Sequence, residues 1–171
     1  MRGRPEAPEA ASYFWKYIDE VEGDDPIAAL ERQLGESAAL FEGISEERSM
    51  FRYAPEKWSM RQALNHVTDV ERAFTFRALW FGRGFTGALE SFDDKIAAAG
   101  AQADRVSWAA HVEEFRVVRL ATISLFRNMP EEAWPRTGVA SGSVISVRAL
   151  AFLTAGHAAH HMEILRERYL G

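Results

Sequence analysis

The chain has 171 residues, of which 47% are hydrophobic and 26% are charged; it carries a net charge of −5 with neutral histidines and contains no cysteine. This length and composition fit one globular domain, which we expect to span residues 1–171, and they exclude a disordered chain. The mild acidity argues against a nucleic-acid or anionic-membrane partner, and the lack of cysteine excludes disulfides, thiolate metal sites and a cysteine nucleophile.

The N-terminal residues 1–12 contain Arg and Glu but no apolar core of the kind that a signal peptide has. We expect them to form a loosely held lead-in, followed by a short helix over residues 13–21 that packs across the rest of the domain. No stretch approaches the roughly 20 uninterrupted apolar residues of a membrane span. Because the absence of cysteine also fits a reducing compartment, we expect a cytoplasmic protein.

The remaining chain has a helical period almost throughout, with no convincing alternating strand and no hairpin signal. Asp24 or Asp25 can cap the first long helix, and Pro26 suits its first position. Ser59 and Gln62 have the spacing of a capping box at the start of the second. We predict four long amphipathic helices, over residues 26–44, 59–81, 107–128 and 147–169.

Four such helices in one small domain predict an all-α four-helix bundle. The connection over residues 83–105 is much longer than a tight turn between antiparallel neighbours requires. A link of this length can cross the bundle and leave the second and third helices parallel. We therefore favour an up-down-down-up topology over a simple up-and-down bundle.

Three of the five histidines lie in the sequence GHAAHHMEI of the last predicted helix. His157 and His161 are four residues apart, which places both imidazoles on one helix face, about 6 Å apart along the axis. The zinc motif HExxH uses the same spacing, but Ala158 stands where that motif needs its glutamate. The pair therefore suits a metal, while a metalloprotease of the HExxH type is a poor fit.

A third ligand candidate is His66, which faces the apolar side of the second predicted helix. A single histidine on such a face is more often a hydrogen-bonded core residue than a metal ligand. A buried imidazole needs a partner, however, and three neutral imidazoles from two helices can hold one divalent ion and leave positions open. We predict a metal site formed by His66, His157 and His161.

Other polar side chains near these histidines have open roles. Asp69 could orient a ligand imidazole through its far nitrogen, or it could be a surface carboxylate beside Arg72. His160 could replace one ligand or hydrogen-bond to one. Gly156 leaves room for a neighbouring helix or a ligand, and we expect Glu71 to form a salt bridge with Arg77 or another arginine. His111 is expected to be structural or exposed.

Three stretches resemble the DinB/YfiT-like superfamily of metal-dependent bundle proteins. Residues 52–79 share its Trp-Ser start of the second helix, its histidine and its Asp-x-Glu; residues 82–94 resemble its crossover; residues 146–170 resemble its final helix with His-x3-His. The resemblance covers residues 13–169. It implies an up-down-down-up bundle with one metal on His66, His157 and His161, and it also implies a homodimer.

The resemblance leaves the reaction open. Some relatives resemble thiol S-transferases that use a low-molecular-weight thiol such as bacillithiol, another serves in a mycothiol-dependent isomerisation, and others are called hydrolases. A metal-dependent enzyme acting on a small-molecule substrate is therefore expected, by thiol transfer or by hydrolysis. The alternatives are a non-catalytic, stress-related binding protein with a structural metal, and a metal-free bundle. Zinc or nickel is the expected ion, and iron is also compatible with imidazole ligands.

Overall fold

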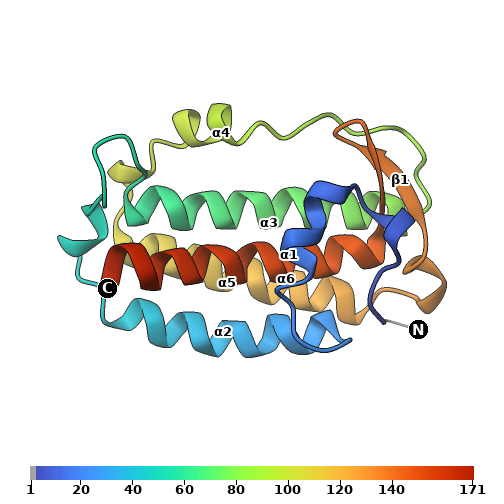
Figure 1. The fold of residues 1–171 in the computed structure, drawn as a ribbon, viewed down its shortest axis with the longest axis horizontal. Helices are drawn as coiled ribbons and strands as arrows, with labels where there is room; N and C mark the ends of the chain where they lie inside the picture. Colours follow the sequence, from blue (N-terminus) through green and yellow to red (C-terminus); the bar gives the residue numbers. More distant parts are fainter. Residues whose placement is uncertain (1–2) are drawn as a thin grey trace.

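The computed structural model describes residues 3–171 and is a helical bundle, as predicted (Figure 1). Figure 1 shows α3 and α5 running away from the end where the C-terminus lies, whereas α2 and α6 run towards it. α3 and α2 each pack against both α5 and α6. The long helices are α2 (Pro26–Glu42), α3 (Met60–Gly82), α5 (Trp108–Arg127) and α6 (Val147–Ile164).

A polar side chain caps the N-terminus of each long helix. Asp25 accepts hydrogen bonds from the amides of the first turn of α2. Ser59 and Gln62 form the predicted capping box of α3, and Ser107 and Ser146 cap α5 and α6. These caps satisfy amides that would otherwise lack partners, which explains why the predicted helix starts agree with the observed ones.

The last predicted helix differs from the expectation at its C-terminal end. α6 ends at Ile164 and continues as the π-helical segment η6 (Leu165–Leu170). The hydroxyl of Tyr169 donates to the carbonyl oxygen of Trp58 at 2.7 Å, and its ring contacts that of Tyr53. The π-helical segment therefore contains the residue, Tyr169, that binds the end of the chain to the segment that precedes α3.

A β-hairpin before α6 corrects the prediction that the chain has no strand. β1 (Thr137–Ala140) and β2 (Ser143–Ser146) pair antiparallel, with Thr137 opposite Ser146. Ser141 and Gly142 both have positive φ, which is the geometry of a tight two-residue hairpin turn. Strands of four residues are too short for an alternating pattern to be visible in the sequence.

The long connection after α3 is also more structured than predicted. It contains α4 (Asp94–Ala101) and η4 (Ala103–Arg105). The amide of Leu89 donates to the carbonyl of Val139, and the amide of Ser141 donates to the carbonyl of Leu89. These bonds fasten the crossover to the edge of the hairpin.

The lead-in was expected to be loosely held over residues 1–12, of which residues 1 and 2 lie outside the described part. The rest is anchored. The guanidinium of Arg4 donates to the carbonyls of Ile18 and Val21, at 2.9 and 2.7 Å. Glu9, in η1 (Ala7–Glu9), pairs with Arg148 of α6. The predicted short helix follows as η2 (Ser12–Phe14) and α1 (Trp15–Ile18), and it packs against α6.

A buried polar network connects the four long helices. Arg119 of α5 pairs with Glu71 of α3 at 2.8 Å, and the two side chains are 0% and 2% exposed. Arg119 also donates to the side-chain oxygen of Gln33 on α2, and Gln33 donates to the carbonyl of Ala155 on α6. The expected salt bridge of Glu71 is thus made with Arg119 and not with Arg77.

No helix within residues 3–171 is both long and apolar enough to cross a membrane.

Candidate metal centre

Three histidines converge in the core between α3 and α6. His66, His157 and His161 each present a ring nitrogen, and these nitrogens all lie within 4.8 Å of one another. Nε2 of His66 lies 3.2 Å from Nε2 of His157. The structure therefore brings together the three side chains that the sequence predicted as ligands.

Helix geometry and close packing produce this convergence. His157 and His161 are one turn apart on α6, and His66 faces them from α3. Beside His157, Gly156 lets α1 approach, because a Cβ at this position would lie 1.9 Å from the carbonyl oxygen of Tyr17. The Tyr17 ring then lies edge-on to the His157 ring, with centroids 5.5 Å apart. Of the two expected alternatives for Gly156, room for a neighbouring helix or for a ligand, the structure shows the helix.

Burial keeps the cluster uncharged. It lowers the pKa of His66, although the charge of Asp94 acts in the opposite direction. Burial, reinforced by the neighbouring imidazoles, lowers the pKa of His157 well below its usual value and that of His161 to about 3. Metal ligation requires neutral imidazoles, and these three are neutral at physiological pH.

The donor set fits a divalent metal. Metal–nitrogen bonds of about 2.1 Å at tetrahedral angles put neighbouring ligand nitrogens about 3.4 Å apart, close to the 3.2 Å between His66 and His157. Within residues 3–171, no hydrogen bond joins any of the three rings to a carboxylate or to a main-chain group. Apart from the contact between His66 and His157, these imidazoles have no hydrogen-bond partner among the described residues, which is unfavourable for buried polar groups.

The two supporting candidates are engaged elsewhere. Asp69 pairs with Arg72 at 3.2 Å, which is the surface-carboxylate alternative, and burial raises the pKa of Asp69. Nδ1 of His160 lies 3.0 Å from a carboxylate oxygen of Glu20. His160 remains adjacent to the cluster, since its ring centroid lies 5.5 Å from that of His161.

His111 is buried away from the cluster. Its Nε2 lies 2.8 Å from the carbonyl oxygen of Ala103, in the segment η4 that precedes α5. The expectation of a structural role is therefore supported, and the alternative of exposure is wrong.

Two separate hollows each include part of the histidine cluster in their walls. One has a volume of about 330 Å³ and includes His66 and His157 in its wall. The other has a volume of about 180 Å³ and includes His161. The remaining lining residues of the larger hollow are Tyr13, Phe14, Lys16, Tyr17, Val70, Ala73, Phe74, Arg77, Phe92, Asp94 and Ser141.

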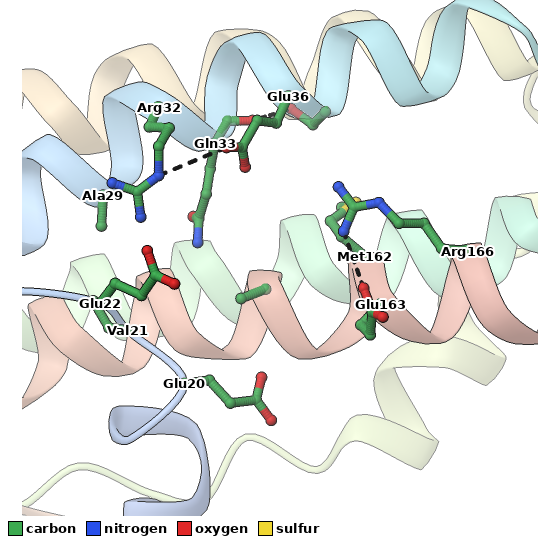
Figure 2. A pocket seen from close by; sticks show the side chains of 12 residues that line it. Glu20, Val21, Glu22, Ala29, Arg32, Gln33, Glu36, Met162, Glu163 and Arg166 are labelled. Carbon is green, nitrogen blue, oxygen red and sulfur yellow. Dashed lines mark hydrogen bonds and ion pairs between the residues drawn. The ribbon is translucent and has the colours of Figure 1, made fainter.

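A further hollow of about 430 Å³ lies between α2 and α6, and it contains none of the three histidines. Figure 2 shows that its charged side chains largely pair within it: Arg32 with Glu36, and Arg166 with Glu163. Gln33, which extends from α2 towards α6 in the same view, belongs to the buried network. We therefore place the functional site at the histidines.

Several residues of the site escaped the sequence analysis. Lys16 and Tyr17 reach it from α1, and Asp94 from the start of α4, although both segments are far from His66 in the sequence. Arg77 was considered only as a partner for Glu71. The sequence gives one indication that Arg77 belongs to the site. Arg77 lies eleven residues after His66, which is about three helical turns and puts both residues on the same helix face.

The chain is similar to a family of known proteins over most of its length. The family model described as the DinB superfamily matches residues 29–165 of the chain. The chain belongs to the DinB superfamily. This confirms the resemblance that the three sequence stretches suggested.

A solved structure shares the DinB bundle seen here. It is YfiT from Bacillus subtilis, described as a probable metal-dependent hydrolase with an unusual four-helix bundle topology. The two structures agree with a TM-score of 0.69 over 95% of this chain and 91% of YfiT, at 15% sequence identity. At that identity the likeness shows a shared fold. Among the curated proteins, none matches the chain.

Proposed function

We propose that this DinB-superfamily protein is a metal-dependent enzyme that hydrolyses a small-molecule substrate, with a divalent ion held by His66, His157 and His161. The observation that carries the proposal is a group of three uncharged imidazoles, two buried and one half-buried, whose nitrogens lie within 4.8 Å, next to a hollow of about 330 Å³. The fold shared with YfiT supports it. Zinc or nickel suits this ligand set best, and iron is compatible with it.

An ion bound here would polarise a substrate carbonyl and lower the pKa of a bound water or thiol. The side chains of this protein would provide the rest. Phe14, Phe74 and Tyr17 give the hollow an aromatic wall, and Asp94 is the carboxylate in that wall. Since Asp94 lines the same hollow as His66 and His157, we assign to Asp94 the role of accepting a proton from the attacking group.

Three protein ligands would leave positions open on a bound ion, which favours a catalytic metal over a structural one. Structural zinc sites normally have four protein ligands. Among residues 3–171, the group of side chains that could hold a metal consists of the three histidines and includes no fourth His, Asp or Glu. His160, which was considered as a replacement ligand, is paired with Glu20.

Thiol transfer is the second candidate, and the smaller hollow favours it. A reaction between a thiol and an electrophile needs room for two molecules, and His161 borders a separate hollow of about 180 Å³ beside Tyr53, Lys57 and Trp58. Because the chain has no cysteine, the thiol would be a low-molecular-weight cofactor.

The test is a turnover screen of protein loaded with zinc, nickel or iron. Chromogenic esters and amides test hydrolysis, and a thiol supplied with an electrophile tests transfer. We expect metal-dependent hydrolysis that His157→Ala abolishes and that Asp94→Asn lowers about 100-fold, the usual contribution of a general base. Asp69→Asn is the matched control and should retain activity. Turnover only with a thiol would favour the second candidate, and metal without any turnover would contradict an enzymatic role.

We also propose the homodimer that the family resemblance implies. Apolar side chains on the outer faces of α3 and α5 support it, because four of them are at least 38% exposed: Phe76, Leu79, Val117 and Leu120. Sedimentation velocity should give twice the mass of one chain, and Phe76→Glu with Val117→Glu should give a monomer. A monomeric wild-type protein would contradict this proposal.

A further inference from the structure

A buried arginine at the far end of the histidine hollow has no anionic partner. Arg77 is 6% exposed, and burial lowers its pKa although Tyr13 acts to raise it. Within residues 3–171, no carboxylate pairs with its guanidinium. An arginine remains charged at neutral pH even so, and a buried charge without a counter-ion is costly.

The main chain and the hairpin hold this guanidinium in place. Nη2 of Arg77 donates to the carbonyl oxygen of Glu90 in the crossover at 3.2 Å, and to the hydroxyl oxygen of Ser141 in the hairpin turn at 3.0 Å. The other two nitrogens, Nε and Nη1, have no hydrogen-bond acceptor among the described residues. Nη2 thus holds the guanidinium of Arg77 in place, while Nε and Nη1 are available to donate hydrogen bonds to a ligand.

The positions of Arg77 and His66 give the hollow two different ends. Both residues lie on α3, eleven positions apart, so they share one helix face and their Cα atoms are about 16 Å apart. Both also line the same hollow of about 330 Å³. One elongated molecule can therefore reach the histidine cluster with one end and Arg77 with the other.

Between these ends the wall is mainly aromatic. Phe14, Phe74 and Phe92 line it, and the rings of Phe14 and Phe74 meet edge to face with centroids 6.4 Å apart. Two further charged groups line the hollow. Lys16 lies over the Tyr17 ring, with its Nζ 4.5 Å from the ring centroid, and Asp94 is exposed at the start of α4. The lining therefore carries one net positive charge, and its buried charge is positive.

We infer that the hollow binds an elongated small molecule with a flat apolar body and a carboxylate, the carboxylate paired with Arg77 and the opposite end directed at the three histidines. As a statement about substrate, this rests on the proposed function; as a statement about binding, it stands on the hollow alone. Without a metal ion, a carboxylate matches the single net positive charge of the lining, whereas a dianionic phosphate would exceed it and would be repelled more strongly by Asp94. The aromatic wall accounts for the flat apolar body.

The test compares ligands that differ only in charge: 4-phenylbutyrate, its neutral amide and 4-phenylbutyl phosphate. Dissociation constants are measured by ligand-observed NMR in the presence of EDTA, so that binding does not depend on a metal or on activity. We expect the carboxylate to bind at least about tenfold more tightly than the amide, as a charge-assisted hydrogen bond to a buried guanidinium provides. We expect the phosphate to bind more weakly than the carboxylate.

Variants then locate the preference. Arg77→Gln should remove the preference for carboxylate over amide and leave the affinity for the amide within about twofold, while Arg77→Lys should restore part of it. Arg72→Gln is the matched control, because Arg72 is an exposed, ion-paired arginine on the same helix, and it should leave the preference unchanged. Circular dichroism checks that each variant is folded. If Arg77→Gln does not fold, Arg77→Lys is used in its place, and its preference for carboxylate over amide should be smaller than that of the wild type.

Equal binding of carboxylate and amide, tighter binding of the phosphate, binding of none of the three ligands, or a preference that survives in Arg77→Gln would overturn the inference. These outcomes are separable from a failure of the proposed function. A protein that binds no metal and yet prefers the carboxylate through Arg77 would refute only the enzyme. A metal-dependent hydrolase with no such preference would refute only the carboxylate site.

Discussion

Gly156 of α6 packs directly against the main chain of Tyr17, so that a Cβ on Gly156 would lie 1.9 Å from the Tyr17 carbonyl oxygen. Gly156→Ala must therefore displace α1. We expect a loss of about 1–3 kcal/mol in the free energy of unfolding, measured by urea denaturation, because overpacking outweighs the better helix propensity of alanine. Displacing Tyr17 should also weaken metal binding, since its ring packs on His157.

The matched control is Gly35→Ala. Gly35 lies within α2, and nothing lies within 4 Å of the position that its Cβ would take. This substitution should stabilise the protein by up to about 1 kcal/mol. Equal effects of the two substitutions would show that helix propensity, and not contact with Tyr17, decides the result at Gly156.

The buried pair of Glu71 and Arg119 should be costly to break and much less costly to replace. Glu71→Ala leaves an arginine that is 0% exposed without its counter-ion, and we expect a loss of about 3–5 kcal/mol in urea denaturation. The double variant Glu71→Leu, Arg119→Met removes both charges and should recover most of this loss.

The exposed pair of Arg116 and Glu113 is the control for that measurement. It joins neighbouring turns of α5 at 2.7 Å, but solvent screens it. Glu113→Ala should leave the denaturation midpoint unchanged. A Glu71→Ala variant as stable as Glu113→Ala would contradict the structural role of the buried network.

The anchor of the N-terminal segment predicts a pH dependence. Burial alone would raise the pKa of Glu9, but hydrogen bonds from Arg148 and Ser146 outweigh it and hold the pKa below the ordinary 4.5. A lowered pKa in the folded state contributes stability above pH 4.5, and this stability is lost as the pH falls through the folded-state pKa. Glu9→Gln should therefore cost about 1–2 kcal/mol at pH 7. The melting temperatures of the two proteins should converge progressively as the pH falls below 4.5, and a difference that stays constant until the proteins unfold in acid would contradict the anchor.

The parts of the fold that local sequence determines could be predicted. Ser59 with Gln62 marks the start of α3 because a capping box is made by residues three apart. The pairing of His157 with His161 follows likewise from one turn of helix. The hairpin at Ser141 and Gly142 could not be seen, because strands of four residues have no period to detect and their pairing with Leu89 is long-range.

The wall of the site was harder to predict than its ligands. Lys16 and Asp94 line the hollow beside the histidines only because of the packing of α1 and the course of the crossover, which no local pattern encodes. The role of Arg77 depends on its lacking a carboxylate partner, because Glu71 pairs with Arg119 instead. Tertiary packing thus determines which charges are paired and which remain available to a ligand.

The most direct test of the account is the metal content of the protein, purified without a histidine tag and measured by plasma mass spectrometry. We predict about one divalent ion per chain. Its loss in His66→Ala and in His161→Ala, and its retention in His160→Ala, would support the site, because His160 lies beside the cluster but pairs with Glu20. A wild-type protein that binds no metal even after reconstitution with zinc, nickel and iron would contradict the central claim.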